Sequence, residues 1–137
     1  MATSHDQPAP SPLPARFTLG ITGLTFVVIG VGFIAVPVSW AESVGIVLPT
    51  AMARTDLRAT YGGFDLAFGL FLAACAHRPA WHAPGLYAAA LALGGFGLTR
   101  LAGHVLDGPL DPFMWKLLAF ELPAAALCIW LYRKQPR

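Results

Sequence analysis

Long apolar stretches separated by short polar breaks run through the whole chain. Four windows of mostly apolar residues can be marked off, at about 17–36, 56–76, 84–106 and 113–132. Each approaches the roughly 20 residues that a helix needs to cross a hydrocarbon core of about 30 Å. Pro37 follows the first window, and Pro84 stands near the first turn of the third, where its missing N–H costs little. The pattern predicts an all-α integral membrane protein with four spans.

The links between these windows predict how the helices pack. The second and third links are short, so consecutive helices there are expected to be antiparallel neighbours in a four-helix bundle spanning 17–132. The first link, 38–55, is too apolar for a free loop and is broken by Pro49. We expect it to form a short amphipathic segment on or in the membrane surface. Residues 1–16 hold four of the twelve prolines and predict a disordered tail, and 133–137 form a basic C-terminal tail.

The composition fits this class and excludes others. The 137 residues are 56% hydrophobic and 12% charged, and the mean hydropathy is +0.62. The net charge of +2 comes without a basic stripe interleaved with aromatic residues, so nucleic acid is not an expected partner. The expected partners are the lipid bilayer, a small lipophilic ligand, and a homo-oligomer or larger membrane complex.

The distribution of basic residues predicts an orientation. They gather on the side of both termini, whereas the turn at 107–112 is acidic, so the positive-inside rule predicts cytoplasmic termini. Arg54 and Arg58 in the first link favour the opposite orientation. The basic residues on the side of the termini are Arg16, Arg78, Arg133, Lys134 and Arg137.

Ionisable residues inside three of the windows form a predicted polar layer. Counted at about 1.5 Å per residue, Asp65, Arg100 and Glu121 lie about 13, 9 and 12 Å below the same membrane surface. A charge that faces lipid costs several kcal/mol, so these residues are expected to face the bundle interior. With Arg58 included the charges sum to zero, which predicts a mutually paired set.

Helical spacing adds neighbours to this layer. The predicted faces are Arg58, Tyr61 and Asp65 at i, i+3 and i+7, and Arg100, His104 and Asp107 at i, i+4 and i+7. The helix-weakening pair Gly62 and Gly63 either allows close helix packing or leaves room for a ligand. Lys116 and His104 would then lie at the mouth of the pocket.

Other candidate chemistry is weaker. His104, Asp107 and Asp111 lack a metal-binding spacing signature, so neither a metal nor a cofactor is predicted. Cys75 and Cys128 are expected to be small apolar packing residues, because a reducing cytoplasm disfavours a disulfide.

The polar layer supports several functional hypotheses. The first is a pocket for a small amphiphilic molecule, whose polar or anionic head Arg58 and Arg100 would bind. The second is an isomerase- or cyclase-type enzyme, in which Glu121 or Asp65 acts as acid or base on a lipophilic substrate. The third is an accessory subunit whose charges only fix folding and assembly, and a proton-coupled exporter is a fourth.

Three motifs support a family resemblance: "LRATYGGFDLAFGLFL" at 57–72, "RLAGHVLDG" at 100–108 and "FEL" at 120–122. Together they resemble small bacterial four-helix membrane proteins catalogued as domain of unknown function 4345, over about 17–132. More distantly, the chain is similar to DoxX-like membrane proteins, some of which are associated with quinone-linked redox complexes. The resemblance implies a four-helix fold in a bacterial inner membrane but no reaction. The positions that match the family motifs are Arg58, Tyr61, Gly62, Gly63, Arg100, Asp107, Gly108 and Glu121.

Overall fold

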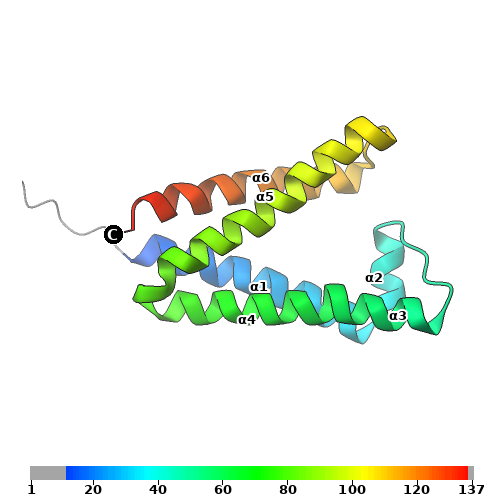
Figure 1. Cartoon of the computed structure of the whole chain (residues 1–137), viewed down its shortest axis with the longest axis horizontal. Coiled ribbons are helices and arrows are strands. Elements are labelled where there is room, and N and C mark those ends of the chain that lie inside the picture. Colours follow the sequence, from blue (N-terminus) through cyan, green and yellow to red (C-terminus); the bar gives the residue numbers. More distant parts are fainter. Residues whose placement is uncertain (1–11, 136–137) are drawn as a thin grey trace, which may run out of the picture.

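A computed structural model of the chain describes residues 12–135, so the predictions for 1–11, 136 and 137 lie outside the described residues. The described part is helical throughout, with no strand, as Figure 1 shows. Its elements are α1 (Leu13–Ala35), α2 (Pro37–Ser43), α3 (Ala51–Leu57), the π-helix η1 (Arg58–Gly63), α4 (Phe64–His77), the 3-10 helix η2 (Pro79–Trp81), α5 (His82–Asp107) and α6 (Pro112–Arg133).

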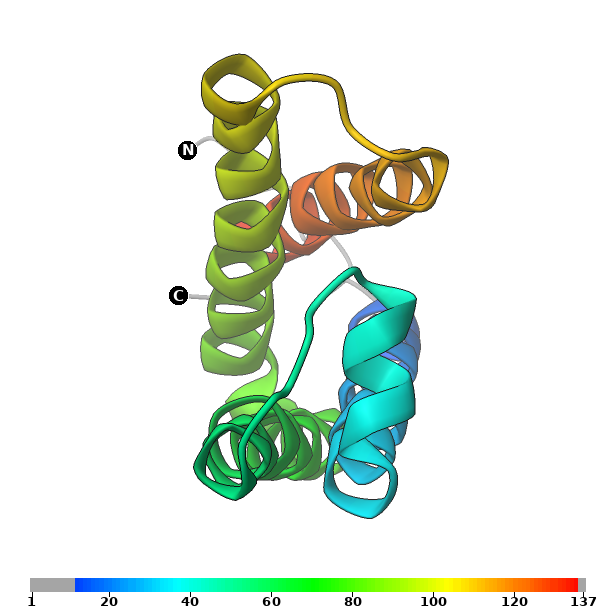
Figure 2. The ribbon, with the colours of Figure 1, turned by 90° about the vertical axis from the view of Figure 1, so that its right-hand side faces the viewer.

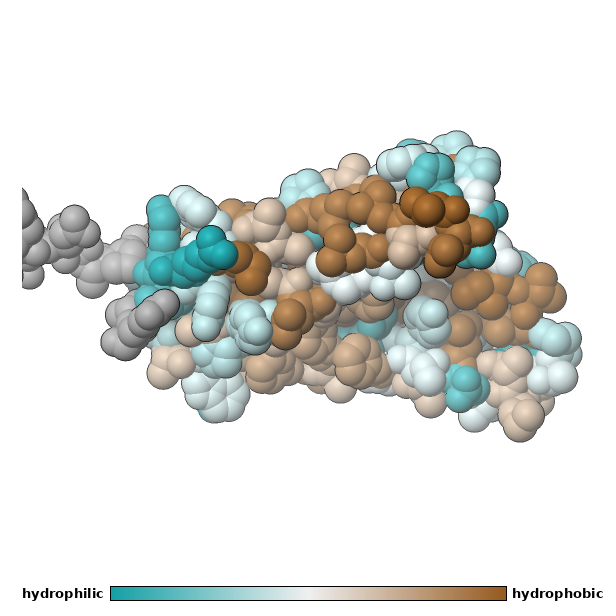
Figure 3. Space-filling model, turned by 45° about the horizontal axis from the view of Figure 1, so that its top comes forward, coloured by the Kyte–Doolittle hydropathy of each residue, from teal (hydrophilic) through white to brown (hydrophobic). Residues whose placement is uncertain are grey.

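Within the described residues 12–135, four helical segments are long and apolar enough to cross a membrane: Leu13–Ala35, Ala51–His77, Pro79–Asp107 and Pro112–Arg133. The second of these joins α3, η1 and α4 into one continuous helix. Apolar side chains cover the middle of the molecule, and hydrophilic residues gather toward its two ends (Figure 3). The prediction of an all-α, four-span, multi-pass membrane protein is therefore confirmed, while its orientation stays a prediction.

Several span boundaries differ from those predicted. The second span begins at Ala51, five residues before the predicted start at 56, because Thr50 caps the helix. The Thr50 hydroxyl accepts a hydrogen bond from the Ala53 backbone N–H at 3.1 Å, which satisfies one of the free donors of the first turn. Residues 13–16, which we assigned to the N-terminal tail, form the first turn of α1, and Arg133 still belongs to α6.

The spans form two close antiparallel pairs, α1 with α4 and α5 with α6 (Figures 1 and 2). We call the end where α1 begins and α6 ends the terminal end, and the end that carries α2, α3 and the 108–111 turn the connector end. Contacts between the two pairs are far fewer than within them. The pairs diverge toward the connector end, on the right of Figure 1.

Glycines hold α1 against α4 at two levels, seven residues apart on each helix. A Cβ atom added to Gly69 would lie 2.6 Å from the Gly23 carbonyl oxygen. Two turns further along α1, a Cβ atom on Gly30 would clash with the Leu66 backbone nitrogen and lie 2.8 Å from the Gly62 carbonyl oxygen. Small residues allow this close backbone approach, which drives helix association in lipid, where no hydrophobic effect does.

The predicted amphipathic segment at 38–55 folds as α2, an extended stretch at 44–50 and the start of α3. It packs on the connector end of α1, where the Trp40 ring contacts Gly32 and lies 5.5 Å from the Phe33 ring. The small cluster that results contains Phe33, Ala41 and Leu57, with Ile29, Trp40, Ile46 and Leu48 beside it. The placement of this segment at a membrane surface stays a prediction.

The larger hydrophobic core lies in the terminal half of the bundle and joins both helix pairs. Its most completely buried members are Leu19, Leu72, Cys75, Leu86, Ala89 and Cys128. Cys75 and Cys128 are both buried free thiols there. Gly85 brings α5 close to α4, since a Cβ atom on it would lie 2.7 Å from the Cys75 Cβ atom.

Candidate functional site

On each of α4, α5 and α6, the side chains that face the bundle interior form a row along the helix. These rows change from apolar to ionisable toward the connector end. Each row is apolar in the terminal half and then contains one charged residue, which is buried on α4 and α6 and half-buried on α5. The rows are Cys75, Leu72 and Asp65 on α4; Leu86, Leu93 and Arg100 on α5; and Cys128, Ala125 and Glu121 on α6. Asp65 and Glu121 are each only 6% exposed, so the prediction that they face the interior is confirmed.

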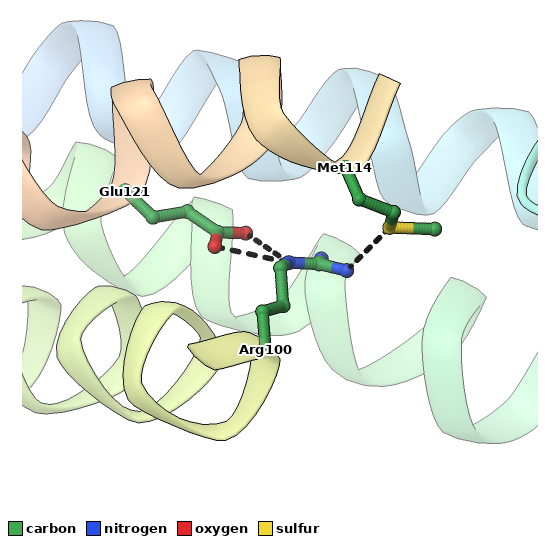
Figure 4. A network of polar contacts seen from close by, with 3 residues as sticks. All are labelled: Arg100, Met114 and Glu121. Atoms are coloured by element: carbon green, nitrogen blue, oxygen red, sulfur yellow. Dashed lines mark hydrogen bonds and ion pairs between the residues drawn. The ribbon is translucent and has the colours of Figure 1, made fainter. Parts of the chain in front are cut away.

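Arg100 and Glu121 form an ion pair between α5 and α6, as Figure 4 shows. The Arg100 Nε atom donates to both Glu121 oxygens, at 3.1 and 3.0 Å, and Nη1 donates to the Met114 sulfur at 3.2 Å. Gly97 lets the two helices approach here, because a Cβ atom on it would lie 2.6 Å from Leu122 Cδ2. The pair neutralises both charges where neither is well exposed to water.

Arg58 has a different partner from the one predicted. Its Nε atom donates to the Ile34 carbonyl oxygen at 3.0 Å. Ile34 lies in the last turn of α1, where carbonyl groups lack helical partners and a positive charge is favourable. The predicted set of four mutually paired charges is therefore wrong: Arg58 stabilises the end of α1 and does not neutralise Asp65.

Asp65 is the ionisable residue without a partner in this layer. Among residues 12–135, no ion pair or hydrogen bond reaches its carboxylate; the residue is only 6% exposed, but its two carboxylate oxygens are not completely enclosed by the protein. Gly85 on α5 and Cys75 on α4 are in contact, so they lie at the same height along the bundle. Counted from that height toward the connector end, Arg100 is fifteen residues away along α5, and Asp65 is ten residues away along α4. Asp65 thus lies about 8 Å nearer the terminal end than Arg100 along the helices. It stands between the apolar core and the ion pair.

A π-helical turn separates Asp65 from the residues predicted to share its face. Residues Arg58–Gly63 form η1, whose i→i+5 hydrogen bonds need more residues per turn than an α-helix and so rotate the following residues. Asp65 is consequently buried, while Arg58 and Tyr61 are exposed, and the predicted common face is wrong. The Tyr61 ring instead packs 5.3 Å from the Phe33 ring.

The two glycines of this turn have different surroundings. Gly62 is needed for close packing, because a Cβ atom there would lie 2.6 Å from Ile34 Cγ1. Gly63 has space beside it, since its added Cβ atom would meet only the Arg58 carbonyl oxygen at 3.7 Å. Close helix packing therefore accounts for Gly62 but not for Gly63.

The other candidate residues, including His104 and Lys116 at the predicted pocket mouth, form local contacts or are exposed. The His104 Nδ1 atom donates to the Gly108 carbonyl oxygen at 3.2 Å, and its ring packs edge-on against Trp115. Asp111 caps α6 by accepting from the Phe113 N–H at 2.7 Å. Asp107 and Lys116 are exposed. Within residues 12–135, no three His, Cys, Asp or Glu side chains are grouped to hold a metal ion.

Sequence reasoning missed an aromatic cluster beside Asp65. The Phe26 ring lies 4.9 Å from Phe68 and 6.3 Å from Phe96, so three helices contribute. Phe64 stacks on Phe68 at 5.9 Å. Phe64 and Phe68 are neighbours of Asp65 along one helix, a spacing visible in the sequence, but the contribution of α1 and α5 was not.

A proline inside α6 is a second feature that the sequence reasoning did not use. Pro123 lacks an N–H, so the Ala119 carbonyl oxygen has no helical hydrogen bond from position i+4. Both residues lie within two positions of Glu121. Regular backbone hydrogen bonding is therefore interrupted next to Glu121 as well as next to Asp65.

These features define a four-span membrane bundle with an apolar terminal half and a partly polar connector half. Residues 14–132 match the family described as Domain of unknown function (DUF4345), and the chain belongs to that family. Neither a curated protein nor a solved structure matches the chain. The relation to DoxX-like proteins stays a prediction.

Proposed function

We propose that this membrane protein binds a small amphiphilic molecule between its two helix pairs, with the polar head of the molecule at Asp65. The observation that carries the proposal is the Asp65 carboxylate, which is 6% exposed and has no partner among residues 12–135. A buried ionisable group in a membrane span is by default a sign of function. Its neighbour Glu121 is equally buried but has Arg100 as a partner.

The free-energy cost of burying a carboxylate without a hydrogen-bond partner supports this interpretation. A buried polar group without a hydrogen-bond partner destabilises a fold by about 1–3 kcal/mol, and more when it is charged. A bound molecule that donates hydrogen bonds to Asp65 offsets this cost. The free energy recovered at the carboxylate then contributes to binding.

The partners of the two arginines define the class of head group. Arg100 is neutralised by Glu121, and the Nε atom of Arg58 is bonded to the end of α1, so neither is poised to bind an anion at Asp65. A carboxylate accepts hydrogen bonds, and a hydroxyl or amino head is therefore the complementary group. The anionic head considered from the sequence is less well matched.

The surroundings of Asp65 suit an apolar body. Phe64 and Phe96 are both exposed beside the better buried Phe26 and Phe68, and their rings supply large apolar surfaces. The helix pairs diverge toward the connector end (Figure 1). A flat or chain-like apolar group could contact these rings while its head lies at Asp65.

A catalytic role has less support than binding. Both Glu121 oxygens accept hydrogen bonds from Arg100, so Glu121 is already engaged in an interaction between α5 and α6. Asp65 could act on a bound molecule, but within residues 12–135 no ion pair or hydrogen bond joins it to a second catalytic group. The proposal is therefore limited to binding.

The test is mass spectrometry of small molecules retained by protein purified in mild detergent. Asp65→Asn removes the buried charge with little change of shape, and Asp56→Asn makes the same chemical change at an exposed position of α3. We expect a hydroxyl- or amine-bearing amphiphile in the wild type and in Asp56→Asn, reduced at least tenfold in folded Asp65→Asn. Equal retention by all three proteins would contradict the proposal.

A further inference from the structure

The terminal end carries a hollow that is separate from the polar layer. It has a volume of about 250 Å³ and lies where α1 begins and α4 ends. Its lining is mainly apolar, with two basic side chains. The lining residues are Arg16, Phe17, Gly20, Ile21, Leu24, Ala76 and His77.

The apolar part of the hollow continues onto the surface of α1 that faces lipid. Phe17, Ile21 and Leu24 are each more than 60% exposed, and they follow one another along one side of the helix. Gly20 forms the floor between them, because a Cβ atom added there meets nothing within 4 Å. The hollow is therefore a mainly apolar groove that is open along the exposed side of α1.

The polar part of the hollow lies at the depth of lipid head groups. Arg16 is in the first turn of the span Leu13–Ala35, and His77 ends the span Ala51–His77. Both residues thus stand at the membrane boundary on the same side. The N-terminus of α1 adds a favourable dipole for an anion next to Arg16.

We propose that this groove binds an anionic phospholipid of the surrounding membrane. Its phosphate is bound by Arg16 and His77, and one acyl chain lies along Phe17, Gly20 and Leu24. Charge complementarity supports an anionic lipid over a zwitterionic one, because the Arg16 guanidinium attracts an anionic head group. His77 adds a ring nitrogen that can hydrogen-bond a phosphate oxygen. The site lies at the end opposite the connector, so it is independent of Asp65.

The test uses nanodiscs that contain equal amounts of dioleoyl phosphatidylglycerol and dioleoyl phosphatidylcholine. The lipids retained after mild extraction are counted by native mass spectrometry. Arg16→Gln removes the charge, and Lys134→Gln removes an equal charge at the same end, where Lys134 lies 3.6 Å above the Trp130 ring. Gly20→Leu fills the groove, and Gly95→Leu adds the same side chain at another position with nothing within 4 Å.

We expect the wild type to retain phosphatidylglycerol in preference to phosphatidylcholine, and Arg16→Gln to lower that preference about fivefold. Gly20→Leu is expected to abolish retention at the groove without a change of charge, while Lys134→Gln and Gly95→Leu behave like the wild type. Equal retention of both lipids by the wild type would overturn the proposal. So would equal losses in Arg16→Gln and Lys134→Gln, which would indicate general attraction to the basic end of the protein.

Discussion

The terminal and connector halves of this bundle are built from the same helices but hold together differently. In the terminal half, both helix pairs meet in one apolar core around Leu72, Leu86 and Cys128. In the connector half, the contacts lie mainly within each pair: glycines between α1 and α4, and the Arg100–Glu121 ion pair between α5 and α6. The rows that are apolar at one end become ionisable at the other.

This difference distinguishes the contacts that hold the helices together from a buried residue that takes no part in them. The terminal core joins the two tight helix pairs. Asp65 belongs neither to this apolar cluster nor to the ion pair. A buried carboxylate with no hydrogen bond or ion pair among residues 12–135 is a candidate for a role in binding.

The largest expected effect comes from separating α1 from α4. Gly30→Ala places a methyl group against the Leu66 backbone, which cannot move without shifting the helix. We expect a loss of about 3 kcal/mol in unfolding free energy, at the upper end of the usual cost of overpacking. Detergent-induced unfolding followed by circular dichroism measures it.

The matched control for this change is Gly20→Ala, on the same helix and with nothing within 4 Å of the added Cβ atom. It should leave stability unchanged or raise it slightly, because alanine favours a helix. Equal losses in the two variants would show that close packing at Gly30 does not hold the pair together.

A cavity in the terminal core is expected to have a smaller effect. Leu86 is fully buried, and Leu86→Ala removes its contacts with both helix pairs. In a water-soluble protein, a buried leucine-to-alanine change costs about 2–5 kcal/mol, part of which is the lost free energy of transferring the side chain out of water. Because the unfolded helices stay in an apolar medium, we expect about 2 kcal/mol. The exposed Leu91, changed to alanine, is the control and should cost under about 0.5 kcal/mol.

Breaking the ion pair of the connector half should have a smaller effect again, which a second substitution cancels. Arg100→Gln leaves the buried Glu121 carboxylate unpaired, and we expect a loss of about 1–2 kcal/mol, less than for a fully buried pair because the Arg100 side chain is 29% exposed. The double variant Arg100→Gln with Glu121→Gln should recover most of it. A double variant as unstable as the sum of the single ones would show that the two residues act independently.

Much of this fold could be predicted because the bilayer restricts the length of a spanning helix and the side of it on which charged residues can lie. The length rule located four spans, and the cost of a lipid-facing charge placed Asp65 and Glu121 in the interior. The start of the second span was predicted too late. The capping interaction of Thr50 decides it, and a hydropathy window does not detect a capping side chain.

The pairing of charges could not be predicted in the same way. Two arginines and two carboxylates allow several neutral pairings, and the choice depends on how η1 turns α4. A π-turn depends on i→i+5 hydrogen bonds that no residue pattern specifies. The aromatic cluster around Phe26 was missed for a related reason, since it needs the contacts of α1 with α4 and α5.

The central claim is that Asp65 serves a ligand and not the fold. The most direct measurement is the unfolding free energy of Asp65→Asn and the wild type after exhaustive detergent exchange has removed retained small molecules. We expect the variant to equal the wild type or to exceed it by up to about 1 kcal/mol, because a neutral amide replaces an unpaired buried carboxylate. A loss of about 2 kcal/mol or more would contradict the account and make Asp65 a structural residue.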